Sequence, residues 1–577
     1  MRKVFAILRI RTGASFVKKR VIAILICLSC IAGLSACGKE AGLEESPDTD
    51  SWMLLVENDD LVLYNTETEA EFVIDTEFYQ NGNDDASISA VSLSTLIKFT
   101  EDGRYFCYFS ESGSACQLKA YDWTALCNDP GNTAPLLVVG NANPEAYQLA
   151  KDSIGYFNGQ ELHWYSFDLD TDWTLCDTFD IENCLFYIAE DGQTMLVSAY
   201  DEYDNPETSL FKIRTAAELH EDSYSGVLQT YTTDLSEIVI LADSETCVDL
   251  ITSESDGKAA QTTLLTLDEA CSQGYDMDSL VVQYADARTI CLNSGLGWQD
   301  GTWVSMPGSI CNTDRFTHKR ADHTYYGSYY SEIEASNHPI FGYYYDDGTR
   351  YVFSDSLTPF QSAASGDTFY ASYDSQHSIL YTISGSPKKG GAMYANTVSN
   401  GSITNETMVS SNAKFSVFDQ TSGTLFYYEP EDAEANRYTY TLYCITNGDT
   451  ANPQKLLNGA GCPVNDYRFH EGALQFEDNT GRILCWTEVD DDACSGAMYL
   501  LNASGTAAAA KICDQASYQS WGSLGDHIYL IQTGSGGNAG TLCVYDGNSV
   551  TECKDGVQAV ITPNNHCTKA LGYAYLF

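Results

Sequence analysis

The chain of 577 residues is poor in basic residues, with 30 Lys and Arg against 80 Asp and Glu and a net charge of −50. Binding to nucleic acid depends on basic patches that release counterions from phosphates, so this balance argues against a nucleic-acid partner. The excess of negative charge also disfavours adsorption to anionic lipid headgroups. A strongly acidic surface favours solubility and could also attract cations or cationic ligands.

Several catalytic and metal-binding motifs are also missing. No Gly-x-Ser-x-Gly pentapeptide is present, which argues against a serine hydrolase of the kind that needs that turn. No His-Glu-x-x-His sequence occurs, and the glycine-rich stretch at 533–540 is not followed by the lysine of a phosphate-binding loop. No Cys-x-x-Cys pair occurs after the first 36 residues, so a thioredoxin-like or zinc-knuckle site is not indicated.

Long apolar runs are absent as well. The longest candidate is residues 21–33, which is too short to span a hydrocarbon core of ~30 Å as a lasting helix. It follows a segment, residues 1–20, that holds seven Lys and Arg and no acidic residue. A basic segment followed by a short apolar one predicts a secretory signal.

The apolar run ends in Leu34-Ser35-Ala36-Cys37, which resembles the lipobox of bacterial lipoproteins, L-[AS]-[GA]-C. The resemblance implies a diacylglycerol thioether on Cys37, cleavage before it, and often an acyl chain such as palmitate on the new amino group. Two or more acyl chains anchor a protein stably, where one is marginal. We therefore expect residues 1–36 to be a signal peptide and the exported chain to be lipid-anchored to the outer face of the cell membrane. A plain signal peptide is the alternative.

Residues 37–51 are polar and acidic and lack aromatic side chains, so they predict a flexible linker after the lipidated cysteine. Loss of the signal leaves 23 basic residues against 80 acidic ones. Residues 52–577 form the predicted folded body, because hydrophobic residues make up 44% of the chain and aromatic residues 12%.

Helical periodicity is scarce in this body, and residues 215–222 are the best short helix candidate. Elsewhere, short apolar runs rich in Tyr, Phe, Val, Ile and Thr are bounded by Gly, Asp, Asn and Ser. This pattern is typical of strands joined by tight turns. The sequence therefore predicts an all-β fold.

A polar turn, often Asp-Gly, followed by an apolar strand recurs along the body, as in residues 101–110 and 190–200. Most intervals are 44–58 residues, and two intervals of 89 have weaker units near their middles, at 151–157 and 336–345. With a further unit at 58–65, eleven units can be recognised. A period of 40–50 residues in an all-strand chain predicts the four-stranded blades of a β-propeller.

The turn-plus-strand element resembles the repeat of TolB-like and dipeptidyl-peptidase N-terminal propellers. We expect one large ring of seven or eight blades with long insertions, and two smaller propellers or a string of β-sandwich modules are the alternatives. Residues 52–59 and 570–577 are both strand-like and suit ring closure.

Cysteine is abundant at 20 residues, of which 17 remain after the signal and Cys37. An exported chain can form disulfides, and buried free cysteine behaves as a small hydrophobe. We expect many core thiols and a few bridges. The spacings of Cys485 with Cys494 and of Cys543 with Cys553 permit pairing across a hairpin, but spacing does not fix connectivity.

Metal ligation has one weak candidate, because Asp168, Asp170 and Asp172 are spaced as in a calcium loop. An EF-hand also needs Gly in the sixth position and Glu in the twelfth, where this chain has Trp173 and Phe179. We expect a solvated hairpin tip and no cofactor, with a Ca²⁺-binding turn as the alternative.

Aromatic residues are concentrated in one part of the chain. The candidate ligand-binding residues are Trp298, Trp303, Tyr325, Tyr326, Tyr329, Tyr330, Tyr343 and Tyr344. Tyrosine gives broad amphipathic contact area at a low entropy cost, although alternating tyrosines are also ordinary strand packing. We expect a binding or scaffold module for protein, peptide or glycan rather than an enzyme. The alternative is a carbohydrate-active hydrolase or lyase that uses paired carboxylates in the propeller mouth.

Overall fold

The computed structural model describes residues 49–563, with gaps at loops. The gaps of four or more residues are 79–96, 178–183, 201–204, 254–258, 312–324, 333–339, 354–367, 432–438, 470–473, 478–481, 491–494, 502–508 and 534–538. Residues 50–577 form one compact unit, and the account below concerns that unit. The predicted signal peptide, Cys37 and almost all of the linker lie outside the described residues. A single 3₁₀ turn, η1 (Thr49–Ser51), precedes the first strand.

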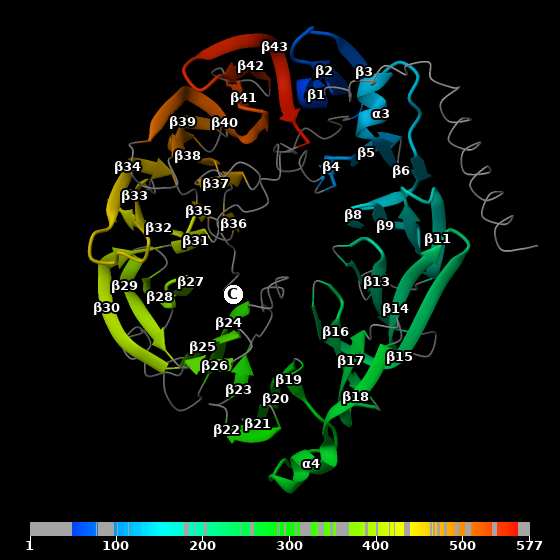
Figure 1. Ribbon diagram of the computed structural model, residues 1–577, viewed down its shortest axis with the longest axis vertical. Helices are drawn as coiled ribbons and strands as arrows, with labels where there is room; N and C mark the ends of the chain where they lie inside the picture. The colour runs from blue at the N-terminus through cyan, green and yellow to red at the C-terminus, as the bar shows by residue number, and fades with distance from the viewer. Residues whose placement is uncertain are drawn as a thin grey trace, which may run out of the picture. The chain divides into compact units, whose positions relative to one another are not determined.

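The described part of the chain is almost entirely β-strand, and each strand pairs antiparallel with its neighbours (Figure 1). Five separate sheets have four strands each. A seven-stranded sheet consists of two four-stranded sets that share β15, and a fourteen-stranded sheet consists of four further sets. The described strands therefore make eleven four-stranded antiparallel sets, which are the blades of a β-propeller.

The first five blades contain the strands that matter most for the site described below. Blade 1 has β1 (Trp52–Glu57), β2 (Asp60–Asn65), β3 (Glu71–Asp75) and the end of β43 (Val550–Ile561). Blade 2 has β4 (Ile97–Phe99), β5 (Tyr105–Ser112), β6 (Ala115–Asp122) and β7 (Leu137–Gly140). Blade 3 has β8 (Ala142–Leu149), β9 (Ser153–Asn158), β10 (Glu161–Ser166) and β11 (Thr171–Asp177). Blade 4 has β12 (Leu185–Ile188), β13 (Thr194–Tyr200), β14 (Pro206–Thr215) and the first half of β15 (Glu218–Tyr231). Blade 5 has the second half of β15, β16 (Glu237–Ala242), β17 (Cys247–Ser253) and β18 (Ala259–Thr266).

The remaining six blades repeat this arrangement. Blade 6 has β19 (Val282–Ala285), β20 (Thr289–Leu292), β21 (Leu296–Gln299) and β22 (Thr302–Ser305). Blade 7 has β23 (Ser309–Cys311), β24 (Tyr325–Glu332), β25 (Ile340–Asp346) and β26 (Arg350–Phe353). Blade 8 has β27 (Thr368–Asp374), β28 (Ile379–Ser386), β29 (Gly390–Ser399) and β30 (Ser402–Ala413). Blade 9 has β31 (Ser416–Asp419), β32 (Thr424–Pro430), β33 (Thr439–Thr446) and β34 (Gln454–Gly461), and a small hairpin of β35 (Val464–Asn465) and β36 (Arg468–Phe469) follows. Blade 10 has β37 (Leu474–Glu477), β38 (Arg482–Asp490), β39 (Ser495–Leu501) and the first part of β40 (Ala510–Leu524). Blade 11 has the end of β40, β41 (His527–Gln532), β42 (Gly540–Tyr545) and the first part of β43.

Blade 1 is built from both ends of the described unit. β1 pairs with β43, with Leu54 opposite Ile561 and Val56 opposite Ala559 (Figure 1). These side chains are almost fully buried, and burying a Leu, Ile or Val side chain is worth about 1.5–3 kcal/mol. The first and last described strands therefore share a blade, which is the closure expected of a single propeller.

A recurring turn links the first two strands of several blades. In blade 2 the carboxylate of Asp102 accepts hydrogen bonds from the Arg104 N–H and the Thr100 hydroxyl, and Gly103 has a φ of 69°. In blade 5 Asp234 accepts the equivalent bonds from Ser236 N–H and the Thr232 hydroxyl. Asp side chains stabilise tight turns in this way because they bond the backbone two residues on. This turn chemistry produces the repeated sequence element.

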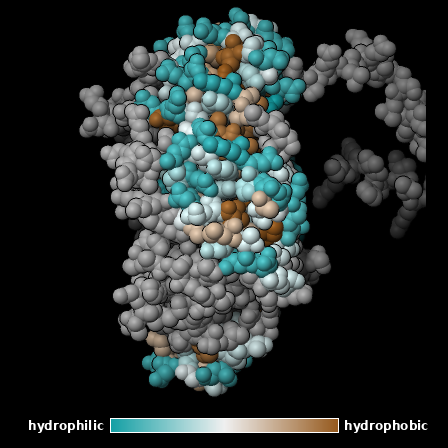
Figure 2. Space-filling model, turned by 90° about the vertical axis from the view of Figure 1, so that its left-hand side faces the viewer, coloured by the Kyte–Doolittle hydropathy of each residue, from teal (hydrophilic) through white to brown (hydrophobic). Residues whose placement is uncertain are grey.

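Neighbouring blades share their hydrophobic cores. One cluster joins Tyr105 and Leu118 of blade 2 to Ile154 and Tyr156 of blade 3. A second joins Phe157 and Trp164 of blade 3 to side chains of blade 4, of which Met195 and Phe211 are fully or almost fully buried. Since a blade cannot cover its own faces, this shared packing stabilises the row of blades. On the face shown in Figure 2, hydrophilic residues cover most of the described surface, and the hydrophobic patches between them are small.

Two sequence-based expectations are wrong in detail, and a third falls partly outside the described residues. The eleven recognised units correspond to eleven blades, where seven or eight with long insertions were expected. Residues 215–222 lie in the β14–β15 hairpin, with Ile213 opposite Leu219, and not in a helix. The partner of β1 is β43, whereas residues 570–577, which were expected to close the ring, lie outside the described residues.

Two short helices occur among the described residues, α3 (Trp123–Asn128) and α4 (Leu267–Ser272). Asp122 caps α3 by accepting the N–H of Ala125. α4 starts with a capping box, in which Thr266 and Glu269 satisfy each other's backbone N–H groups. The Thr-x-x-Glu spacing is a recognised start signal and could have predicted α4 from the sequence.

Candidate binding pocket

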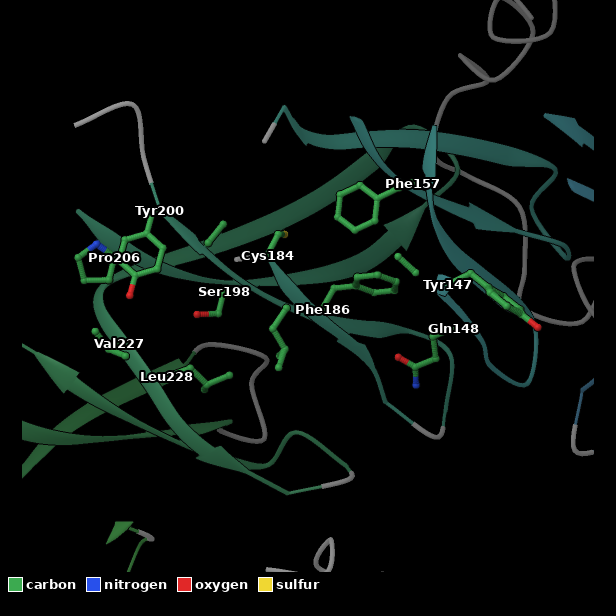
Figure 3. Close-up of a pocket in the computed structure, with 13 residues that line it drawn as sticks. Tyr147, Gln148, Phe157, Cys184, Phe186, Ser198, Tyr200, Pro206, Val227 and Leu228 are labelled. Carbon is green, nitrogen blue, oxygen red and sulfur yellow. The ribbon is translucent and has the colours of Figure 1, made fainter. Parts of the chain in front are cut away.

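An open cavity of about 620 Å³ lies across the first strands of blades 3, 4 and 5 (Figure 3). Those strands are β8, β12 and the second half of β15, and the β13–β14 hairpin closes one side. The lining residues are Ala146, Tyr147, Gln148, Phe157, Cys184, Leu185, Phe186, Ser198, Ala199, Tyr200, Pro206, Val227 and Leu228. A concave, mostly apolar site assembled from several elements is typical of ligand pockets.

Aromatic rings form much of the pocket wall. Phe157 and Phe186 meet edge to face, with ring centroids 5.7 Å apart. Tyr200 lies beside Pro206, its partner across the β13–β14 pair (Figure 3). Leu185 and Tyr200 remain 45% and 49% exposed, although large apolar side chains are usually buried. These two side chains therefore offer apolar surface to a partner without needing to move.

Gly155 explains why Phe186 can pack so closely against blade 3. A Cβ atom at this position would lie 2.7 Å from both the Met195 methyl group and the Phe186 ring. Real Cβ contacts are not that short, so only glycine lets β9 approach β12 at this point.

Two polar side chains of the pocket, those of Gln148 and Ser198, already have partners. Gln148 Nε2 donates to the Ile188 carbonyl at 3.0 Å, and Gln148 Oε1 accepts the Ile188 N–H at 2.7 Å. The Ser198 hydroxyl lies 3.4 Å from that of Thr208, which donates to the Gly226 carbonyl. These two side chains are therefore not available to a ligand without breaking existing contacts.

The edge of β12 that faces away from β13 carries one more pair of backbone groups besides those of Ile188. Ile188 directs its N–H and carbonyl toward Gln148, away from β13. Since backbone groups alternate along an antiparallel strand, Phe186, two residues earlier, directs its N–H and carbonyl to the same edge. An extended chain could pair with Phe186 while its side chains enter the pocket.

The described residues that line the pocket carry no formal charge near neutral pH. None of the described lining residues is an acid, a histidine, a lysine or an arginine. Burial raises the pKa of the Tyr147 phenol well above its ordinary value. The hydrogen bond to Cys176 and burial raise the pKa of the Cys184 thiol in the same way. The described lining residues therefore offer a ligand no charged group.

The predicted aromatic residues lie in other blades. Trp298 on β21 lies opposite Trp303 on β22, and both are partly buried against a core cluster that includes Ile290. Strand β24 holds Tyr325, Tyr326, Tyr329 and Tyr330, and β25 holds Tyr343 and Tyr344. The side chains of these six tyrosines lie outside the described residues. Ligand binding by the eight residues remains a prediction, and neither Trp298 nor Trp303 is among the described residues that line the pocket.

The three aspartates of the weak calcium candidate each contact different groups. Asp168 pairs with Arg104 at 2.9 Å and accepts the Tyr105 hydroxyl. Asp170 accepts the Tyr165 hydroxyl, and Asp172 accepts that of Tyr156. Within the described part of the chain, no group of three or more His, Cys, Asp or Glu is placed to hold a metal ion. Calcium binding stays a prediction.

The cysteines proposed for hairpin pairing can be located in part. Cys543 is buried and donates to the Thr541 carbonyl, whereas Cys553 is exposed and donates to the Thr551 carbonyl. Cys485 is buried, and Cys494 lies outside the described residues. No helix in the described ranges is both long and apolar enough to cross a membrane.

No family model and no curated protein matches this chain. Among solved structures it is similar to a eukaryotic initiation factor, at 10% identity over 77% of this chain and 96% of that one, with a TM-score of 0.39. It is also similar to Porphyromonas gingivalis dipeptidyl peptidase 4, at 11% identity over 78% and 65%, with a TM-score of 0.36. A third is the β-propeller domain of the Trilobed protease from Pyrococcus furiosus, at 12% identity over 63% and 97%, with a TM-score of 0.23.

These values are too low to transfer any residue role. The propeller assignment itself depends on the strand pairing described above.

Proposed function

We propose that this chain is an exported, lipid-anchored propeller protein that binds an extended peptide or protein segment in the pocket of blades 3–5. The observation that carries the proposal is an uncharged, aromatic-lined cavity beside the open edge of β12. Extended peptides bind such edges by adding a strand, and pockets for alternate side chains supply the selectivity.

A peptide suits this pocket better than a glycan. Sugars present many hydroxyl groups, and a site that buries them must supply hydrogen-bond partners. Here Gln148 is occupied by Ile188 and the Ser198 hydroxyl lies close to that of Thr208. Apolar anchor side chains would instead bury the exposed surfaces of Leu185 and Tyr200.

Glycoside hydrolysis at this pocket has little chemical support. It usually needs two carboxyl groups on either side of the scissile bond, and no described lining residue has one. The hydrolase or lyase alternative therefore requires a different part of the propeller.

Attachment to the membrane is proposed from the sequence around Cys37. The acidic body is repelled by anionic headgroups, so acyl chains on Cys37 would hold it at the membrane.

The proposal is tested with an array of immobilised synthetic peptides in which one central position is varied. The full-length protein, purified in detergent, is expected to bind peptides with an aromatic or aliphatic central residue and to ignore those with Gly or Asp there. The variant Leu185→Asp is expected to weaken binding at least about tenfold, because a carboxylate in the apolar wall opposes burial of the ligand.

Val138→Asp is the matched control, because Val138 is 52% exposed on β7 and does not line the pocket. Equal binding by both variants, or no peptide selected by the wild type, would contradict the pocket assignment. Binding or cleavage of members of a glycan array by the same preparation would favour the alternative function.

A further inference from the structure

Two cysteines lie together where blade 3 leads into blade 4. Cys176 is the penultimate residue of β11, and Cys184 directly precedes β12. Both pack against the core cluster that contains Phe157 and Leu162. Both cysteines are free thiols in the structure, and the Cys184 thiol is hydrogen-bonded to the Cys176 side chain.

Both side chains are also within reach of solution. Each is partly exposed, unlike the buried Cys107 and Cys444. Cys184 lines the open pocket, which gives a small oxidant a path to the pair. In contrast, the thiols of Cys543 and Cys553 each donate to a backbone carbonyl. Proximity and access therefore coincide at Cys176 and Cys184.

We propose that Cys176 and Cys184 form a disulfide bond in the exported protein, which fixes the end of β11 to the start of β12 beside the pocket. The inference rests on the proposed export to an oxidising compartment, and it is independent of what the pocket binds. The bond forms by thiol–disulfide exchange with a small-molecule disulfide or a disulfide-bearing oxidoreductase. Two cysteine protons and two electrons pass to the incoming disulfide, which is reduced to two thiols, while one S–S bond forms in this chain.

The bond forms most readily while the chain folds. The thiolate is the attacking species, and the contact with Cys176 and burial raise the pKa of Cys184 in the folded protein. Exchange in the folded state is therefore slow, and a bond made during folding persists. It restrains the unfolded chain between residues 176 and 184 and holds Leu185 and Phe186 in the pocket wall.

The test is disulfide mapping of the full-length protein. The protein is purified with free thiols blocked by iodoacetamide, digested without reduction and analysed by mass spectrometry. We expect a peptide pair joined through Cys176 and Cys184, lighter by two hydrogen atoms than the sum of its separate thiol peptides. After treatment with dithiothreitol the pair is expected to separate and both cysteines to accept the alkylating reagent.

A second arm tests the geometry independently of export. Protein reduced while unfolded is refolded with oxidised and reduced glutathione. Cys271, which is exposed in α4, serves as the internal control because it reacts with glutathione whenever the reagent is active. Alkylation of both Cys176 and Cys184 alongside modified Cys271, or bonding of either to another cysteine, would overturn the proposal.

Two variants distinguish the effect of the disulfide bond from the effect of losing a cysteine side chain. Cys176→Ser is expected to leave Cys184 alkylatable and to lower the Tm of the oxidised protein to that of the reduced wild type. Cys271→Ser is expected to change neither the map nor the Tm. If Cys176→Ser lowers the Tm of the reduced protein by the same amount, the residue contributes packing and the bond is absent.

Discussion

The side-chain amide of Gln148 makes both hydrogen bonds that a neighbouring β-strand would give to Ile188, accepting its N–H at 2.7 Å and donating to its carbonyl at 3.0 Å. Gln148 belongs to blade 3 and Ile188 to blade 4. One side chain therefore covers part of the open edge of β12 and joins two blades. It also limits how far a bound peptide could extend along that edge.

Replacing Gln148 with Ala should destabilise the protein by about 1–3 kcal/mol, because two backbone groups of Ile188 would lose partners in a partly buried place. Chemical denaturation monitored by tryptophan fluorescence measures the loss. Gln229→Ala is the control, because Gln229 is also partly buried but donates at 3.3 Å to a carbonyl of its own strand, two residues away. If both variants lose the same free energy of unfolding, the hydrogen bonds between Gln148 and Ile188 stabilise the protein no more than a hydrogen bond within one strand.

The turn of blade 4 provides a test of contact between blades. Gly192 has a φ of 71°, and a Cβ there would lie 1.9 Å from a carboxylate oxygen of Asp152 in the turn of blade 3. Gly525 has a φ of 53° in the turn of blade 11, and a Cβ there would have no atom within 4 Å. Replacing either glycine with alanine places a Cβ atom on a residue with positive φ, which costs about 1–2 kcal/mol.

Gly192→Ala should therefore destabilise the protein by about 1–3 kcal/mol more than Gly525→Ala, since it adds overpacking to the same backbone cost. The difference in unfolding free energy between the two variants measures the contact. Equal values would mean that Asp152 moves aside without cost and that the turns of blades 3 and 4 are not tightly packed.

Blade 1 is closed by an ionic contact as well as by apolar packing. Lys554 of β43 lies 3.1 Å from Glu57 of β1 and also pairs with Glu71 of β3. Burial raises the pKa of Glu57, and Lys554 opposes that rise. When the pKa of an acid is higher in the folded than in the unfolded state, the protein loses stability as the pH rises through the range between these two pKa values. Without Lys554 the pKa of Glu57 should rise further, so this loss of stability should become larger.

We expect Lys554→Met to cost about 1–3 kcal/mol at pH 7 and clearly less near pH 4, where a larger share of Glu57 is protonated and the missing charge of Lys554 matters less. Denaturation of variant and wild type at both pH values gives the difference directly. Lys511→Met is the control, because Lys511 pairs with Asp514 on the surface, and exposed pairs contribute little. A loss that does not depend on pH would indicate that Lys554 contributes only packing.

The blades were predictable because their signal is local. The turn built around Asp102 occupies a few consecutive residues, and the same turn recurs around Asp234. The eleven units in the sequence correspond to eleven blades among the described strands, and the expected number was too small because some of these units were assigned to insertions. Residues 215–222 were taken for a helix because pairing between β14 and β15, which local propensity does not report, decides their structure.

The pocket was not predictable in the same way. Its residues come from strands of three blades, from Ala146 to Leu228, and no short motif contains more than three of them. Trp298 and Tyr325 stood out because aromatic residues are dense around them, whereas Tyr147 and Phe186 are spaced like any core residue. The position of a pocket depends on how blades pack, and that information is not local.

The lipid anchor is the remaining prediction, and Cys37 decides it. Growth with an alkyne analogue of palmitate should label the wild-type protein, and intact mass should show a chain that starts at Cys37 and carries acyl groups. Cys37→Ser should lose the label, because serine has no thiol for the thioether, and should keep residues 1–36 if cleavage requires the lipid. Cys30→Ser is the matched control, because Cys30 lies in the apolar run outside the four-residue pattern.

Since a single acyl chain binds membranes only marginally, a protein with one chain should dissociate on dilution and one with two or three should not. Unlabelled wild-type protein with Ala36 still joined to Cys37 would refute the anchor while leaving the propeller and its pocket unaffected.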